Sequence, residues 1–173
     1  MPVVDNFPGS TLLQVGQQEK LHEWVGVPKS WKLIYKASRD GFLASDFHSM
    51  CDGKGENLGV IKSDNGYLFG WWTPISWKSS NAFAIDASTF IFTLTNPAGV
   101  PAKYKNKDAS CAVYDGSSCG PKLGNCDIHV WNTPTDSHTT FPTCYEDTTG
   151  RGPATFTGSG NFQVSDLEVF VPE

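Results

Sequence analysis

One continuous stretch, residues 34–77, limits the possible folds more than any other part of the chain. It reads IYKASRDGFLASDFHSMCDGKGENLGVIKSDNGYLFGWWTPISW. Just before and into it, Trp31, Leu33 and Tyr35 alternate with more polar neighbours, which predicts a strand. After a turn at residues 39–41, four side chains share one face of a short helix over 44–51; they are Ala44, Phe47, His48 and Cys51.

The second half of this stretch predicts a β-hairpin. Residues 58–62 and 67–72 have strand composition, and the pair Asn65-Gly66 lies between them. This pair favours a tight type I′ turn, because asparagine and glycine tolerate two successive positive φ angles. Glycines at 53 and 55 end the preceding helix.

The rest of the chain predicts one more helix and several short strands. Thr11 and Gln14 can form a capping box for an amphipathic helix over about 12–25. Further strands are expected over 88–95 and 111–114, from Ile128 to Val130, and over 167–171. Residues 78–86 and 102–108 read as loops, and 132–153 as a long surface connection.

These elements predict the fold class. Many short strands and few helices indicate a mainly β (α+β) protein, a two-sheet antiparallel β-sandwich flanked by a few short helices. The 173 residues suit a single domain over 1–173, with the sandwich from about residue 30. A largely buried set is expected: Leu33, Phe47, Phe69, Phe90, Phe92, Ile128, Val130 and Val169.

Charge and cysteine content bear on the compartment and on the kinds of partner. The net charge of −5, with scattered basic residues, disfavours nucleic acid and anionic membranes as partners. No signal peptide or apolar span of about 18 residues is visible, so we expect a cytoplasmic monomer without direct membrane insertion. Five cysteines without a C-x-x-C pair favour free thiols. The alternative is a secreted fragment with bridges among Cys111, Cys119, Cys126 and Cys144.

The central stretch resembles the TLDc domains of oxidation-resistance proteins and certain nuclear receptor coactivators. The likeness rests on Ser38 to Phe42, on Phe47-His48 with Cys51-Asp52, and on Phe69 to Thr73 before Trp77. It continues through residues 90–97, 120–128 and 157–170, and Trp71 stands where the family usually has glycine. The resemblance implies a β-sandwich flanked by helices, protection against oxidative stress, and binding of the vacuolar proton-pumping ATPase (V-ATPase).

No residue pattern predicts catalysis, a cofactor site or a metal site. The G-x-S-x-G signature of serine hydrolases is absent, and Gly158-Ser159-Gly160 reads as a turn. His48 and Cys51 fit a buried histidine beside a small apolar thiol better than a reactive pair. His129 has the polar phase of its strand, and His22 and His138 have no nearby partner in sequence, so no metal-ligand set is expected.

Trp71 and Trp72 are the candidate partner-binding residues. Adjacent strand residues point to opposite faces, so both indoles cannot enter one core. The exposed one favours recognition, and a loop-covered structural pair is the alternative. We predict a non-enzymatic protein-interaction module, and the TLDc resemblance implies that its partner is the soluble sector of the V-ATPase. The alternatives are a thiol-dependent or hydrolytic enzyme centred on Cys51 and His48, and a carbohydrate-binding sandwich that uses Trp71 and Trp72.

Overall fold

Two antiparallel sheets of six strands form the body of the computed structural model, which describes residues 5–173. Sheet A has the order β1 (Trp31–Lys36), β12 (Val164–Pro172), β2 (Asn57–Ser63), β3 (Leu68–Thr73), β5 (Phe90–Thr95) and β6 (Ala102–Lys105). Sheet B has the order β11 (Asn161–Phe162), β10 (Ser137–His138), β9 (Ile128–His129), β8 (Lys122–Leu123), β7 (Val113–Tyr114) and β4 (Phe83–Ala84). These sheets confirm the predicted fold class.

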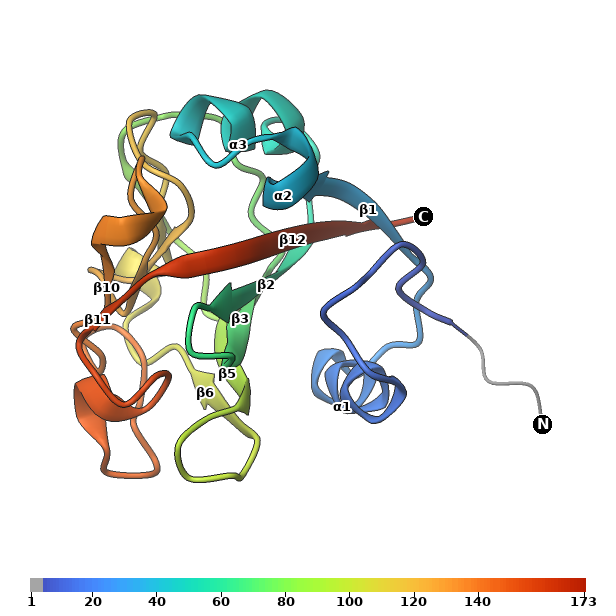
Figure 1. Cartoon of the computed structure of the whole chain (residues 1–173). Helices are drawn as coiled ribbons and strands as arrows, with labels where there is room; N and C mark the ends of the chain where they lie inside the picture. The colour runs from blue at the N-terminus through green and yellow to red at the C-terminus, as the bar shows by residue number, and fades with distance from the viewer. Residues whose placement is uncertain (1–4) are drawn as a thin grey trace.

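Helices lie around sheet A. The α-helices are α1 (Val15–Val25), α2 (Ala37–Asp40) and α3 (Ala44–Cys51), and the short 3₁₀ turns are η1 (Ala109–Cys111), η2 (Pro134–Asp136) and η3 (Gly152–Ala154). Figure 1 shows α1 on one side of β2, β3 and β5, with β10 and β11 on the other side. None of the helices within residues 5–173 is long and apolar enough to cross a bilayer.

Sheet A is buried on both faces, so its strands hold two separate cores. Ile61 and Phe69 belong to the core that sheet A shares with sheet B. Val60 and Phe92 belong to a second core, which Leu21 of α1 and other N-terminal residues cover. Because successive strand residues alternate between faces, β2 buries residues on both sides and lacks a polar face.

The predicted core is confirmed except at one position. Leu33 is half-buried, because the register of β1 against β12 shifts between Leu33 and Tyr35. The other seven predicted positions are buried, with exposed fractions of 0 to 5%. The helix over 44–51 is also confirmed, with Ala44, Phe47, His48 and Cys51 on its buried face.

The predicted N-terminal helix begins too early. The helix starts at Val15 and not at residue 12. Thr11 does not cap it, because the Thr11 backbone N–H donates to the buried Glu168 carboxylate, 2.8 Å away. Gln17 accepts a hydrogen bond from the Gln14 N–H instead, at 2.9 Å.

The hairpin between β2 and β3 has its predicted strands but not its predicted turn. Only Gly66 has a positive φ, of 91°, and Asn65 does not. A type I′ turn needs both. The Ser63 N–H donates to the Tyr67 carbonyl across the loop, so three residues make the connection.

Several segments predicted as loops are ordered parts of the sheets. Residues 102–105 form the edge strand β6, and the turn at 39–41 includes the short helix α2. The predicted surface connection 132–153 contains β10 and places Phe141 and Tyr145 fully inside the core. The predicted strand over 111–114 shortens to β7, and the strand over 88–95 starts at Phe90. Aromatic residues in polar surroundings were the signal for burial in 132–153.

The cysteines differ from expectation. Cys111 and Cys144 form a disulfide across 33 residues, while Cys51, Cys119 and Cys126 are free. The prediction that all five thiols are free is therefore wrong for one pair, and sequence spacing could not identify that pair because only the fold brings the two loops together. Disulfides persist mainly in oxidising compartments, so this bridge weighs against the predicted cytoplasmic location.

Candidate functional site

The first candidate site is the His48 cluster, formed by His48, Asp52 and Ser79. His48 is 9% exposed on α3, and its Nδ1 lies 2.7 Å from Asp52 Oδ1. Its Nε2 lies 2.9 Å from each of two carbonyl oxygens, those of Gly116 and Cys119. The Ser79 hydroxyl donates to Asp52 Oδ2 at 2.6 Å and lies 3.1 Å from His48 Nδ1.

This arrangement has the composition of a serine triad but not its geometry. In a triad the serine and the carboxylate face different ring nitrogens, so that one nitrogen can take the hydroxyl proton. Here Ser79 and Asp52 face the same nitrogen of His48. The other nitrogen faces two carbonyls, which only accept, so it keeps its proton. The predicted buried histidine, satisfied by backbone groups, is confirmed.

Cys51 lies next to this cluster in sequence and is inert by environment. The side chain is 2% exposed in the core between the sheets. Burial raises the pKa of the Cys51 thiol far above its usual range, and the nearby Asp52 carboxylate raises the pKa further. A reactive thiol needs the thiolate form and access to solvent. Cys51 has neither, which fits the small apolar role predicted for it.

Trp71 is wholly inside the core between the sheets. It is 0% exposed, and its indole N–H donates to Asn57 Oδ1 at 2.8 Å, an oxygen that the Trp77 indole also reaches at 2.9 Å. The ring covers Gly59 on the neighbouring strand, where an added Cβ would lie 2.1 Å from it. Gly59 therefore makes room for the indole.

Trp72 lies on the opposite face of β3, as predicted from the alternation of strand residues. It is half-buried and stacks on Phe90 with ring centroids 5.5 Å apart. Its indole N–H donates to Glu56 Oε1 at 2.9 Å. Of the predicted partner-binding pair, only Trp72 reaches the surface; partner binding itself stays a prediction.

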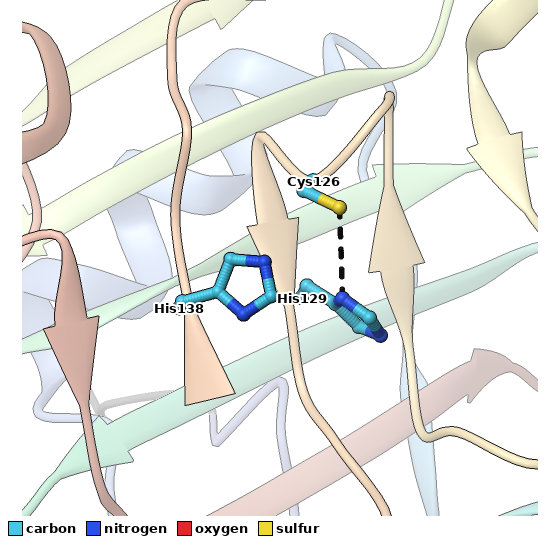
Figure 2. Close-up of side chains that lie close together, drawn as sticks. All are labelled: Cys126, His129 and His138. Atoms are coloured by element: carbon cyan, nitrogen blue, oxygen red, sulfur yellow. Dashed lines mark hydrogen bonds between the residues drawn. The ribbon is translucent and has the colours of Figure 1, made fainter. Parts of the chain in front are cut away.

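A second cluster, which the sequence did not predict, lies on the outer face of sheet B. The His129 cluster consists of Cys126, His129 and His138, whose donor atoms all lie within 4.8 Å of one another. His129 of β9 and His138 of β10 are direct cross-strand partners. Figure 2 shows Cys126 in the turn before β9, with its sulfur directed toward His129. Cys126 Sγ lies 3.6 Å from His129 Nδ1.

The environment of His129 keeps its ring neutral. Burial lowers the pKa of His129 to about 4, and the neighbouring Lys122 and His138 add to this effect. The side chain is 3% exposed, because Trp131 packs on it with ring centroids 4.4 Å apart. His129 Nε2 is buried and has no hydrogen-bond partner among the described residues.

Sequence analysis placed His129 on the correct face but missed its burial and its partners. The two strands that bring His129 and His138 together are only two residues long, too short for any alternating pattern. Trp131, outside both strands, supplies the cover. The available signal was Cys126-x-x-His129, followed nine residues later by His138.

Another group of possible metal ligands is already used for structure. Asp115 lies beside His48 and Asp52, with donor atoms within 4.8 Å. Its carboxylate accepts three backbone N–H groups, those of residues 78, 79 and 80, at 3.0 to 3.1 Å. These bonds and those of the His48 cluster occupy the atoms that an ion would need.

Comparison with known proteins identifies the family. The fold is a two-sheet antiparallel sandwich, and the sequence model of the TLDc domain matches residues 9–173. The chain belongs to the TLDc domain family. None of the curated proteins compared with it gives a match.

Proposed function

We propose that this chain is a non-enzymatic protein-interaction module that contributes to protection against oxidative stress by binding and regulating the V-ATPase. Membership of the TLDc family, which includes the oxidation-resistance proteins, supports the stress role. The proposed contact is with the soluble sector of the pump. It requires a cytoplasmic location, against which the Cys111–Cys144 disulfide weighs.

The observation that carries the non-enzymatic part is the His48 cluster. One nitrogen of His48 is hydrogen-bonded to two carbonyls, and the other nitrogen faces both Asp52 and Ser79. General-base catalysis needs a nitrogen that is free to accept a proton from a substrate or nucleophile. His48 is therefore a residue whose hydrogen bonds connect α3 to residues 116–119.

The alternatives receive less support from the geometry. A thiol-dependent enzyme would need an accessible Cys51 thiolate, but the thiol is buried and its pKa is raised. A sugar-binding platform would need both indoles on one surface. Trp71 is buried in one core, and Trp72 packs on the other face of the strand.

Direct binding to the purified soluble sector of the V-ATPase tests the proposal. We expect saturable binding by the wild-type chain and by Cys51→Ala. Trp72→Ala should weaken it, because truncation of an interface tryptophan typically costs about 2 kcal/mol or more. Trp131→Ala is the matched control, since Trp131 is 41% exposed on the other side of the molecule, outside sheet A.

Two results would contradict the proposal in different ways. No binding by the wild-type chain would remove the pump as partner. Weakening by Trp131→Ala but not by Trp72→Ala would keep the pump and move the binding surface from sheet A to sheet B.

A further inference from the structure

We propose that Cys126, His129 and His138 form a binding site for a transition-metal ion of the zinc class, with one coordination position left open on the outer face of sheet B. One thiolate and two imidazoles are donors that zinc prefers. Three protein donors leave the fourth tetrahedral position for water or for a group from a partner.

The spacing of the donors fits such an ion. Zinc binds sulfur at about 2.3 Å and imidazole nitrogen at about 2.0–2.1 Å, which puts S and N about 3.6 Å apart in a tetrahedral site. Cys126 Sγ and His129 Nδ1 are 3.6 Å apart. The third donor lies within 4.8 Å of both, so a small rotation of the His138 side chain closes the set.

The backbone holds the donors in place. His129 and His138 are fixed opposite each other by the pairing of β9 with β10. Cys126 has a φ of 69°, a left-handed conformation that is costly for a non-glycine residue and that is found often at ligand sites. Thr140 secures it, because its N–H and its hydroxyl both donate to the Cys126 carbonyl, at 2.7 and 3.1 Å.

His129 lacks the strong partners that a buried imidazole normally has. It is 3% exposed, its Nδ1 faces only the weakly accepting sulfur of Cys126, and its Nε2 has no partner among the described residues. Buried polar atoms are nearly always hydrogen-bonded, and the exceptions need an explanation. An ion at Nδ1 would replace a weak contact with a strong one.

Trp131 competes with the ion for His138. The Trp131 indole N–H donates to His138 Nδ1 at 3.2 Å, so the proton of the neutral ring lies on Nε2, the nitrogen left for the metal. Binding at Nε2 moves this proton to Nδ1, which then can no longer accept from the indole. Trp131 is 41% exposed and can turn away. Binding also releases the Cys126 thiol proton to solvent.

A nearby positive charge, that of Lys122, opposes a cation at this site, as it opposes protonation of His129. Lys122 is the cross-strand neighbour of His129, but its ammonium group lies 4.6 Å above the Tyr114 ring, toward β7. The bound thiolate would offset one of the two metal charges.

Metal titration of the full chain tests the site. The protein is stripped with a chelator and kept under argon, then titrated with Zn²⁺ by calorimetry and with Co²⁺ by absorption. We expect one ion per chain and a sulfur-to-cobalt charge-transfer band. Cys126→Ser should abolish the band. Cys126→Ser and His138→Asn should each weaken Zn²⁺ binding at least about tenfold. Loss of a residue that only hydrogen-bonds to a metal ligand already weakens binding by about that much.

Two further variants separate the site from general effects. Cys119→Ala removes a free cysteine outside the cluster and should leave binding unchanged. Trp131→Phe keeps a ring over His129 but removes the competing N–H, so it should tighten binding, a change that misfolding cannot produce. No saturable binding of either metal below about 1 mM would overturn the proposal, as would binding unaffected by Cys126→Ser and His138→Asn.

Discussion

The His48 and His129 clusters contain equally buried histidines in opposite states of satisfaction. His48 has partners at 2.7 to 2.9 Å on both ring nitrogens. His129 has a sulfur at 3.6 Å on one nitrogen and no partner among residues 5–173 on the other. Their exposed fractions are 9% and 3%, so burial does not separate them.

The difference shows which buried polar groups are free to act. A histidine whose nitrogens are all occupied stabilises the fold, and it must lose those bonds before it can bind or react. A histidine without strong partners adds little to stability and keeps its capacity for a ligand. His48 and Cys51 therefore fit a structural role, while the His129 cluster is the better candidate for chemistry.

Removal of the disulfide should give the largest loss of unfolding free energy. The bridge lies on the same side of the molecule as the His129 cluster. The bridge closes a loop of 33 residues, for which chain entropy predicts a loss of about 3–4 kcal/mol of unfolding free energy in Cys111→Ser/Cys144→Ser. Cys144 also borders this cluster, because its N–H donates to the buried Asp127 that follows Cys126. Urea unfolding measures the loss.

Mass spectrometry after alkylation of the native, unreduced chain is the companion measurement. We expect residues 111 and 144 to stay unlabelled until a reductant is added. Cys144 is buried, so half-buried Cys111 is the informative thiol. Labelling of Cys111 without reductant would show that the bridge is absent, and it would remove the argument against a cytoplasmic location.

Substitution of the two histidines compares the clusters directly. His48→Ala leaves two buried carbonyls without their donor and removes the histidine contact of Asp52, which keeps the Ser79 hydroxyl, so it should cost about 2–3 kcal/mol of unfolding free energy. His129→Gln removes no strong hydrogen bond and should cost about 1 kcal/mol or less. Urea unfolding of the metal-free proteins measures both, and equal losses would refute the distinction.

The pH dependence of stability should report the lowered pKa of His129. The pKa of His129 falls from 6.5 to about 4 on folding, so above pH 6.5 the ring is neutral in both states. As the pH drops from 6.5 toward 4, the unfolded chain takes up the proton first, and the folded state loses stability relative to it. His129→Gln lacks this group, so the wild type should lose more stability than the variant in that window, measured by urea unfolding with chelator present. Parallel curves would contradict the lowered pKa.

The sequence predicted sheet A except for its edge strand β6, because the other strands are long enough to show a pattern. The elements of residues 31–73 matched, since alternation over six or seven residues and helical spacing over eight are readable. The errors there were local. The loop at Asn65 is longer than the predicted type I′ turn. Thr11 hydrogen-bonds to Glu168, far along the chain, and does not cap the N-terminal helix.

Sheet B was predicted from the sequence only at the strands that became β7 and β9. Its strands have two residues each, and buried carboxylates hold the connections between them. Asp127, for example, is 0% exposed and accepts from the N–H groups of Thr143 and Cys144 at 2.7 and 2.9 Å. Such long-range side-chain bonds have no periodic signal, so the His129 cluster that depends on them was not predicted.

Labelling of the native thiols, with and without Zn²⁺, tests the central claim most directly. The claim is that Cys51 is structural while Cys126 belongs to a ligand site. Cys51 and Cys119 are 2% and 4% exposed, whereas Cys126 is partly exposed. With iodoacetamide and peptide mass spectrometry, the account predicts that Cys126 reacts first, that Zn²⁺ protects it, and that Cys51 reacts only as fast as the chain unfolds. A Cys51 that reacts faster than Cys126, without regard to Zn²⁺, would contradict the account and favour the thiol enzyme.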